Sequence, residues 1–208
     1  MKYLFVLVSV LAAFGAGCVR TTKSMDSTPS VPPISAVVVP GGWEVYSNTS
    51  PNFSFAYPKD ALAAKSDSFP DDLILVDFGL SVTNTRAISV PDRQLHVRVV
   101  AASSPNVKDC FYSESGWPSG YASMRQEKVT FNGAAFCLSV ERDAGAGNYY
   151  DTYNYLTKTG DQYVLMNFVV HSVNCLNYDN PAEKCVDFDE SRDTAIFADV
   201  MNTFSLAR

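Results

Sequence analysis

Hydrophobic and polar residues alternate along much of the chain after Trp43, which is the pattern of β-strands with one buried face. The clearest alternation runs from Gln94 to Val100, where Leu and Val occupy every second position and polar residues lie between them. Further strands are predicted over 43–47, 53–57, 73–78, 128–131, 134–142, 149–157 and 162–171. Short turn-rich segments join the last four, and Asn132-Gly133 among them is the strongest signal for a tight hairpin. We therefore expect an antiparallel meander in the second half of the chain.

One predicted strand differs from the others in having no polar face. The segment from Tyr163 to Val170 is hydrophobic on both sides except at Asn167. Such a strand is typical of the interior of a sheet that is covered on each face.

Two segments indicate helices. From Asp189 to Thr203, large hydrophobic residues recur at the spacing of one helical face. Acidic residues cluster at the start of this segment, where the helix dipole favours negative charge. A second, short helix is predicted over 59–65. Strands followed by a closing helix predict an α+β domain, in which a twisted antiparallel sheet has helices packed on it.

A hydrophobic run near the start of the chain predicts export. Leu4 to Phe14 is mainly apolar, follows a lysine, and is followed by Gly15-Ala16-Gly17 and then Cys18. This is the layout of a secretory signal peptide, and the run is too short to span a bilayer of roughly 30 Å. We expect residues 1–17 to be removed after export.

The small residues before Cys18 also resemble a bacterial lipobox, whose cysteine becomes the first residue of the processed protein and carries lipid. Acyl chains on Cys18 would hold the protein at a membrane. Gly15 stands where a lipobox usually has leucine, and an ordinary signal peptidase accepts the same small residues. A soluble periplasmic or secreted protein is therefore the alternative.

Composition separates a tether from a single domain. Residues 18–42 are rich in Ser, Thr and Pro without periodicity, which is typical of an extended spacer. The remaining residues, 43–208, then form one globular domain. The chain has 16 Lys and Arg against 22 Asp and Glu, a net charge of −6. This balance argues against nucleic acid as a partner, because phosphate backbones are bound through excess positive charge.

Five cysteines divide into one plus four if Cys18 carries lipid. Cys110, Cys137, Cys175 and Cys185 remain, and an exported protein is expected to pair them as disulfides. Three connectivities exist. We favour Cys175–Cys185, because the short segment between these cysteines can close a surface loop, together with Cys110–Cys137.

Candidate chemistry is sparse. Six residues near the predicted meander are candidates for a ligand or partner surface: Asp143, Asn148, Tyr149, Tyr153, Tyr155 and His171. The three tyrosines share one strand face, which is usually packed under a helix and serves as a binding surface only when exposed. His96 is expected to be exposed to solvent beside Arg98.

Two other readings of the polar residues remain open. His171 could act as the general base of a hydrolase with Ser172, Asp143 or Asp151. The acidic segment 187–193 could bind calcium, although it lacks the glycine and the final glutamate of an EF-hand loop. No metal ligand set, cofactor or catalytic residue is predicted.

Short motifs resemble those of a bacterial family. Trp43-Glu-Val-Tyr-Ser-Asn48, followed by Phe53-Ser-Phe-Ala-Tyr-Pro58, resembles the opening of many small envelope lipoproteins of unknown function, whose fold is similar to that of PsbP. The ending Ile196 to Phe204 is similar to the closing helix of that group, and segments 143–150 and 170–174 resemble its central hairpin and strand end. The resemblance implies a PsbP-like α/β/α sandwich and an envelope setting, and it transfers no catalytic residue.

The expected function is that of a non-enzymatic accessory or binding module in the cell envelope. The lipid on Cys18 would tether it to a membrane, and an envelope protein is a candidate partner. A hydrolase using His171 and a calcium- or small-ligand-binding protein are the alternatives.

Overall fold

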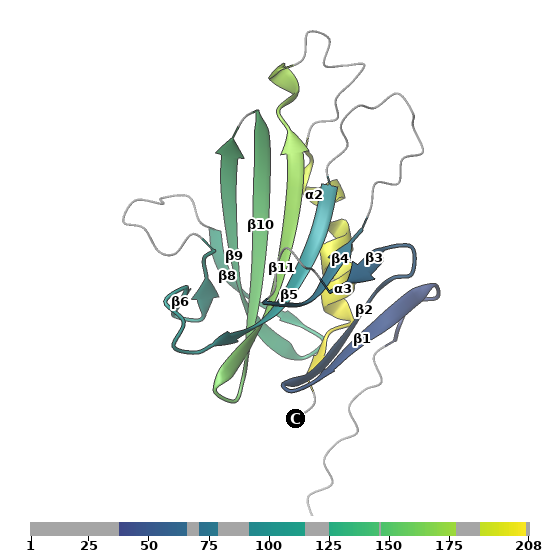
Figure 1. Ribbon diagram of the computed structural model, residues 1–208, viewed down its shortest axis with the longest axis vertical. Coiled ribbons are helices and arrows are strands. Elements are labelled where there is room, and N and C mark those ends of the chain that lie inside the picture. Colours follow the sequence, from purple (N-terminus) through teal and green to yellow (C-terminus); the bar gives the residue numbers. More distant parts are fainter. Residues whose placement is uncertain are drawn as a thin grey trace, which may run out of the picture. The chain divides into compact units, whose positions relative to one another are not determined.

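The structure is a computed structural model that describes residues 38–65, 71–78, 92–114, 125–145, 147–177 and 188–206 (Figure 1). Antiparallel sheets dominate these residues, and the largest has seven strands in the order β3-β4-β5-β11-β10-β9-β8. In chain order its strands are β3 (Leu62–Ala64), β4 (Asp72–Asp77), β5 (Asp92–Ala101), β8 (Arg125–Phe131), β9 (Ala134–Gly145), β10 (Asn148–Thr159) and β11 (Gln162–Val173).

Two smaller sheets and three helical segments accompany the large sheet. The first small sheet has the order β1-β2-β12 and contains β1 (Trp43–Thr49), β2 (Asn52–Pro58) and β12 (Ser205–Leu206). The second is a hairpin of β6 (Val107–Lys108) and β7 (Phe111–Tyr112). The helical segments are the 3-10 turn η1 (Cys175–Asn177), α2 (Glu190–Asp193) and α3 (Ala195–Asn202). None of the helices in the described ranges is long and apolar enough to cross a membrane.

The predicted meander is confirmed. β8, β9, β10 and β11 follow one another in the chain and pair antiparallel as neighbours. Asn132 and Gly133 form the turn between β8 and β9 with φ angles of 45° and 76°. Positive φ at both central residues gives the turn a twist that matches the flanking strands, which explains the Asn-Gly sequence.

The predicted central strand is also confirmed. β11 lies between β5 and β10 in the large sheet. Its side chains from Val164 to Phe168 are buried on both faces of the sheet.

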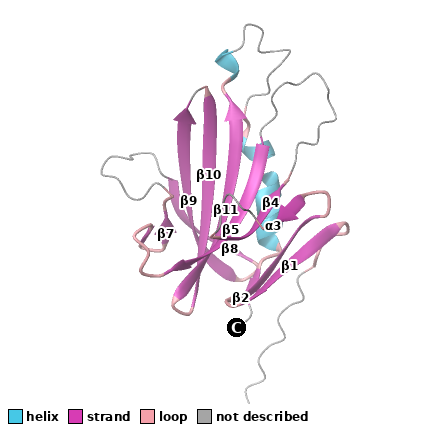
Figure 2. Ribbon diagram, viewed as in Figure 1, coloured by secondary structure: helices cyan, strands magenta, loops and turns pink. Residues whose placement is uncertain are grey.

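The predicted α+β sandwich with packed helices is wrong, because the domain is mainly β (Figure 2). α3 has eight residues, α2 has four and η1 has three. We call the face of the large sheet that packs against α3 the inner face, and the opposite face the outer face. Where an α/β/α sandwich would have a second helical layer, the outer face carries the β6–β7 hairpin: Tyr112 packs on Leu156 and Leu165.

The predicted helices are wrong in detail. Leu62–Ala64, within the segment expected to form a short helix, is instead the edge strand β3, which pairs with β4. A helix of two turns is marginal alone, whereas pairing with β4 satisfies the backbone directly. The closing helix is divided at Thr194, whose N–H and Oγ1–H both point to Glu190 O, at 3.0 and 2.6 Å. These two bonds end α2, and α3 begins at the next residue.

The core lies between the inner face, α3 and the small sheet. Phe168 of β11 meets Phe197 of α3 with ring centroids 4.3 Å apart. Phe204, which follows α3, contacts Phe136 of β9 at 5.1 Å and Phe53 of β2 at 5.8 Å. A cluster of aromatic rings therefore joins the two sheets and the helix into one hydrophobic core.

Candidate functional site

The candidate surface residues are divided between the two faces of the sheet. His171 pairs with Tyr150, and Tyr150 pairs with Asp143, so these three side chains share the outer face. The His171 ring stacks on Tyr150 at 4.8 Å, and its Nε2 lies 3.1 Å from Asn148 Oδ1. Asp143 is exposed and accepts a hydrogen bond from Ala144 N–H at 2.8 Å. His171, Asn148 and Asp143 thus lie in one region, on the outer face near the strand ends.

The three candidate tyrosines point the other way. Tyr153 and Tyr155 are only 3% and 8% exposed. Tyr153 packs against Phe197 of α3 at 5.7 Å, and Tyr155 meets Phe168 edge-to-face at 5.8 Å. They belong to the core, as expected for an aromatic face covered by a helix. Tyr149, nearer the strand end, is only partly buried.

Because Tyr153 and Tyr155 are buried, we expect the folded protein to lose stability at alkaline pH. Burial raises the pKa of Tyr155 to about 12, and burial also raises the pKa of Tyr153. In the unfolded chain a tyrosine ionises near pH 10, so the stability present below that pH is lost as pH rises towards 12. Tyr155→Phe should make the protein more resistant at pH 12, by about 2 kcal/mol relative to the wild type.

Urea denaturation between pH 7 and pH 12 measures this effect. At pH 7 the variant and the wild type should be nearly equally stable, and their free energies of unfolding should separate only above pH 10. Two curves that stay parallel over the whole range would show that Tyr155 ionises as readily in the folded protein as in the unfolded chain.

Two of the three residues proposed as partners of His171, Ser172 and Asp151, lie on the opposite face of the sheet. His171 and Ser172 are successive residues of β11, so their side chains project from opposite faces of the sheet. Asp151 lies on the inner face, where both of its carboxylate oxygens accept hydrogen bonds from Arg142. Asp143 shares the outer face with His171, where its carboxylate accepts a hydrogen bond from Ala144 N–H. The geometry thus separates the base from the serine proposed as its partner.

A pocket of about 300 Å³ lies where β9, β10 and β11 end. It is lined by Arg142, Tyr149, Ser172, Val173, Asn174, Cys175 and Phe188. Arg142 sits at one wall, with its Nε 2.5 Å and its Nη2 2.8 Å from the two oxygens of Asp151. The hydrogen bonds that Arg142 donates to the Asp151 carboxylate raise the pKa of Arg142. The guanidinium also lies over the rings of Tyr149 and Phe188, at 5.8 and 5.6 Å from their centroids.

Only Tyr149 among the candidate surface residues lines this pocket. The sequence pattern does not indicate Arg142 or Ser172 as pocket residues. The predicted hairpin could have placed Arg142 directly opposite Asp151, as the register does. Nothing in the sequence places Phe188 beside them, because it lies 46 residues after Arg142, just before α2.

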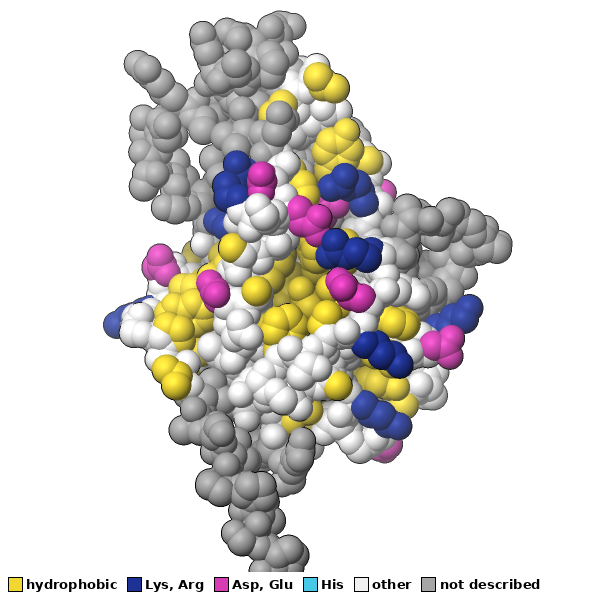
Figure 3. Space-filling view, turned by 180° about the vertical axis from the view of Figure 1, so that it is seen from behind, with side chains coloured by type: hydrophobic (Ala, Val, Ile, Leu, Met, Phe, Trp, Pro, Cys, Tyr) yellow, Lys and Arg dark blue, Asp and Glu magenta, His cyan; other side chains and the backbone are white. Residues whose placement is uncertain are grey.

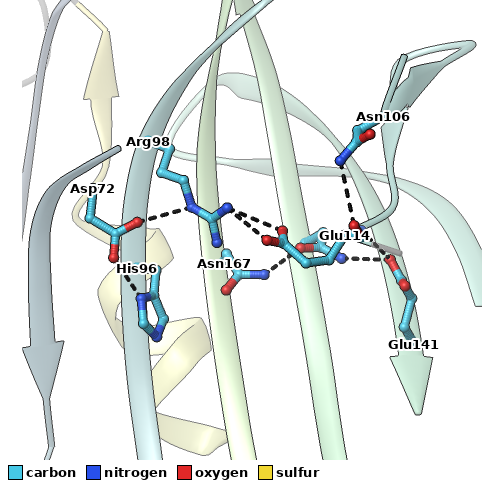
Figure 4. A network of polar contacts seen from close by, with 8 residues as sticks. Asp72, His96, Arg98, Asn106, Glu114, Glu141 and Asn167 are labelled. Atoms are coloured by element: carbon cyan, nitrogen blue, oxygen red, sulfur yellow. Dashed lines mark hydrogen bonds and ion pairs between the residues drawn. The ribbon is translucent and has the colours of Figure 1, made fainter. Parts of the chain in front are cut away.

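A network of polar side chains crosses the outer face of the large sheet (Figure 4). His96 of β5 is 4% exposed, and its Nδ1 lies 2.7 Å from Oδ2 of the buried Asp72. The expectation that His96 is exposed to solvent is therefore wrong. The alternation along β5 correctly places it opposite Leu95 and Val97, but the outer face is itself covered there.

Arg98 connects two carboxylates in this network. Its Nε lies 3.0 Å from Asp72 Oδ1, and its Nη1 donates to Glu114 Oε1 at 2.9 Å. The contact with Asp72 is an ion pair without hydrogen-bond alignment. Burial on its own would lower the pKa of Arg98, but the hydrogen bond and charge of Glu114 outweigh that effect and raise it.

A second part of the network lies on β9, β10 and β11. Asn167 Nδ2 donates to Asn154 Oδ1 at 2.5 Å, and Asn154 Nδ2 donates to Glu141 Oε1 at 3.1 Å. Glu141 also accepts hydrogen bonds from Ser113 Oγ and from Glu114 N–H, each at 3.3 Å. The buried polar groups satisfy one another, so this network stabilises one arrangement of the strands and of the segment after β7.

The acidic segment proposed for calcium has structural contacts of its own where it is described. Asp189 Oδ1 caps α2 by accepting from Arg192 N–H at 2.9 Å, and Asp193 Oδ2 accepts from Arg192 Nη2 at 2.6 Å. The backbone hydrogen bond from Arg192 lowers the pKa of Asp189. Among the described residues, no three His, Cys, Asp or Glu side chains are placed to hold a metal ion.

One predicted disulfide is confirmed. Cys110 and Cys137 are bonded, with their Cα atoms 5.9 Å apart. The bond ties the turn between β6 and β7 to the outer face of β9. Cys175 is also disulfide-bonded, and Cys185, its predicted partner, lies outside the described residues, as do Cys18 and the leader 1–17.

Comparison with known proteins adds little to this geometry. No family model matches the chain, and no curated protein matches it either. A crystal structure from Bacteroides thetaiotaomicron VPI-5482, whose description states no function, is similar over 80% of this chain at 12% sequence identity, with a TM-score of 0.46. The chain spans about half the length of that protein, 49%.

Proposed function

We propose that the protein is an exported lipoprotein of the bacterial cell envelope that acts as a binding module without catalysis of its own. The observation that carries this proposal is the Cys110–Cys137 disulfide, in a chain whose residues 1–17 have the layout of a signal peptide. Disulfides form and persist in exported proteins, whereas cytosolic thiols are kept reduced. The second disulfide, at Cys175, supports the same compartment.

The binding role is supported by the way the polar side chains are used. On the outer face, the buried Asn167 and Asn154 hydrogen-bond to one another and to Glu141, and His171 and Ser172 project from opposite faces. The pocket beside Arg142, in contrast, is a concave site lined by both aromatic and polar side chains. The resemblance of the Trp43–Pro58 segment to envelope lipoproteins is consistent with the same role.

Cys18→Ala tests the lipid anchor. In a bacterial host, the wild-type protein should stay with the membrane fraction, while the variant should lose that association. The intact mass of the purified wild type should correspond to a chain that starts at Cys18, carries acyl groups, and has lost two hydrogen atoms for each disulfide.

The control is Ser24→Ala in the tether, which changes a neighbouring side chain without removing the sulfur and should leave the membrane association unchanged. Equal partitioning of the wild type and Cys18→Ala, or a wild-type mass without acyl groups, would contradict lipidation. Export by an ordinary signal peptidase would then remain, since it predicts the same disulfides in a soluble protein.

A further inference from the structure

The pocket at the ends of β9, β10 and β11 has an unsatisfied polar group in its wall. Ser172 lines the pocket, the residue is 2% exposed, and its Oγ finds no hydrogen-bond partner in the described part of the chain. A buried hydroxyl without a partner destabilises a fold. Native proteins rarely keep such a group, and each case requires an explanation, such as a ligand or water that bonds to it.

Arg142 supplies further donors on the same side of the sheet. Its Nε and Nη2 are used by Asp151, while Nη1 makes no hydrogen bond within the described ranges. The guanidinium is held in place by the Asp151 carboxylate, which is 4% exposed, and by the Tyr149 and Phe188 rings. A fixed guanidinium loses little conformational freedom when it binds a ligand.

The charge around Arg142 favours an anion of low charge. Asp151 already neutralises the guanidinium, so the pocket presents donors without a strong positive field. The chain as a whole is acidic, with a net charge of −6, and the face shown in Figure 3 carries Lys and Arg interspersed with Asp and Glu rather than a basic patch. These surroundings repel a multiply charged phosphate more strongly than a carboxylate with a single negative charge.

The size and walls of the pocket indicate the rest of the ligand. A volume of about 300 Å³ is at the lower end of the range for small-molecule sites. Val173, Phe188 and Tyr149 provide apolar and aromatic surface beside the donors. We propose that this pocket binds a small monocarboxylate with an apolar, planar body, and that Ser172 Oγ–H and Arg142 Nη1–H donate to the carboxylate.

This inference specifies the ligand class of the binding role proposed above, and it does not depend on the lipid anchor. Benzoate is a suitable probe, with benzyl alcohol as a neutral compound that keeps the ring and lacks the carboxylate, and inorganic phosphate as a competing anion. Titration of the purified protein, followed by amide NMR signals, should show saturable shifts at Tyr149 and Val173 with benzoate. Benzyl alcohol and phosphate should bind at least tenfold more weakly.

Ser172→Ala is the decisive variant, and Ser47→Ala on the exposed strand β1 is its matched control. Ser172→Ala should weaken benzoate binding about tenfold, because it removes a hydrogen bond to a charged group. It should leave the Tm of the ligand-free protein unchanged or raise it, since an unsatisfied buried hydroxyl is removed. Ser47→Ala should change neither measurement.

Three results would overturn the proposal. Benzoate binding that is equal in the wild type and in Ser172→Ala would exclude the hydroxyl as a donor. A lower Tm for ligand-free Ser172→Ala would show that the hydroxyl already has a partner within the protein. Absence of saturable shifts would exclude a carboxylate site, while membrane association through Cys18 would be unaffected by any of these results.

Discussion

Replacing both Cys110 and Cys137 with serine should lower the free energy of unfolding by about 3.5 kcal/mol. The bond closes a loop across a sequence separation of 27 residues. Removing it restores the conformational entropy of that loop to the unfolded chain, and the chain-entropy relation for a loop of this length gives the stated value. Urea denaturation under non-reducing conditions measures the difference.

Loss of the Cys110–Cys137 disulfide should also make the β6–β7 hairpin open more often in the native protein. The bridge holds the β6–β7 hairpin on the outer face, where Ser139 Oγ donates to Tyr112 O. Hydrogen exchange at β7 should therefore accelerate more in the double variant than exchange at β10 and β11. The control is Ser104→Ala in the loop before β6, which leaves the disulfide intact and should have a small effect. A double variant as stable as the wild type would show that the disulfide adds nothing to the stability of the fold.

Arg98→Met should destabilise the protein by about 3 kcal/mol, because it leaves the Asp72 carboxylate buried without its cationic partner. Only 1% of the Asp72 side chain is exposed, and Arg98 is the one arginine that reaches it within the described residues. Methionine keeps most of the packing volume of the arginine stem, so the measured loss reports on charge more than on a cavity. Thermal and urea denaturation at pH 7 provide the measurement.

Two companion variants make the result specific to the buried carboxylate. Glu114 is the other partner of Arg98, and the Glu114 side chain is 51% exposed. Glu114→Gln should therefore lower the free energy of unfolding by less than about 1 kcal/mol. Combining Asp72→Asn with Arg98→Met removes both buried charges and should recover part of the stability lost in Arg98→Met alone. If Glu114→Gln destabilised the protein as much as Arg98→Met, the exposed Arg98–Glu114 contact, and not the buried Arg98–Asp72 contact, would account for the stabilisation.

The strands could be predicted because their signals are local. Alternation along 94–100, the Asn132-Gly133 turn and the continuous hydrophobic run in β11 each depend on neighbouring residues. The class of fold could not be predicted in the same way. Alternation shows that a strand has two different faces, but it does not show whether a helix, a hairpin or solvent covers the second one.

His96 illustrates this limit. Its polar neighbours along β5 suggest exposure, yet it is buried against Asp72, which lies 24 residues earlier in the chain. The pocket likewise depends on contact between residues that are distant in the sequence. Arg142 and Tyr149 come from the predicted hairpin, but Phe188 joins them from a segment 46 residues after Arg142, and no local pattern encodes that approach.

The position of β12 has a consequence for the timing of folding. β12 pairs with β2, and Ala56 N–H donates to Thr203 Oγ1 across 147 residues of sequence. At a synthesis rate of about 5–20 residues per second, β2 emerges roughly 7–30 s before the residues that complete its sheet. Phe204 arrives equally late, although it fills the core between Phe53 and Phe136. During synthesis the growing chain thus lacks the last pieces of its core until residues 203–206 have been made.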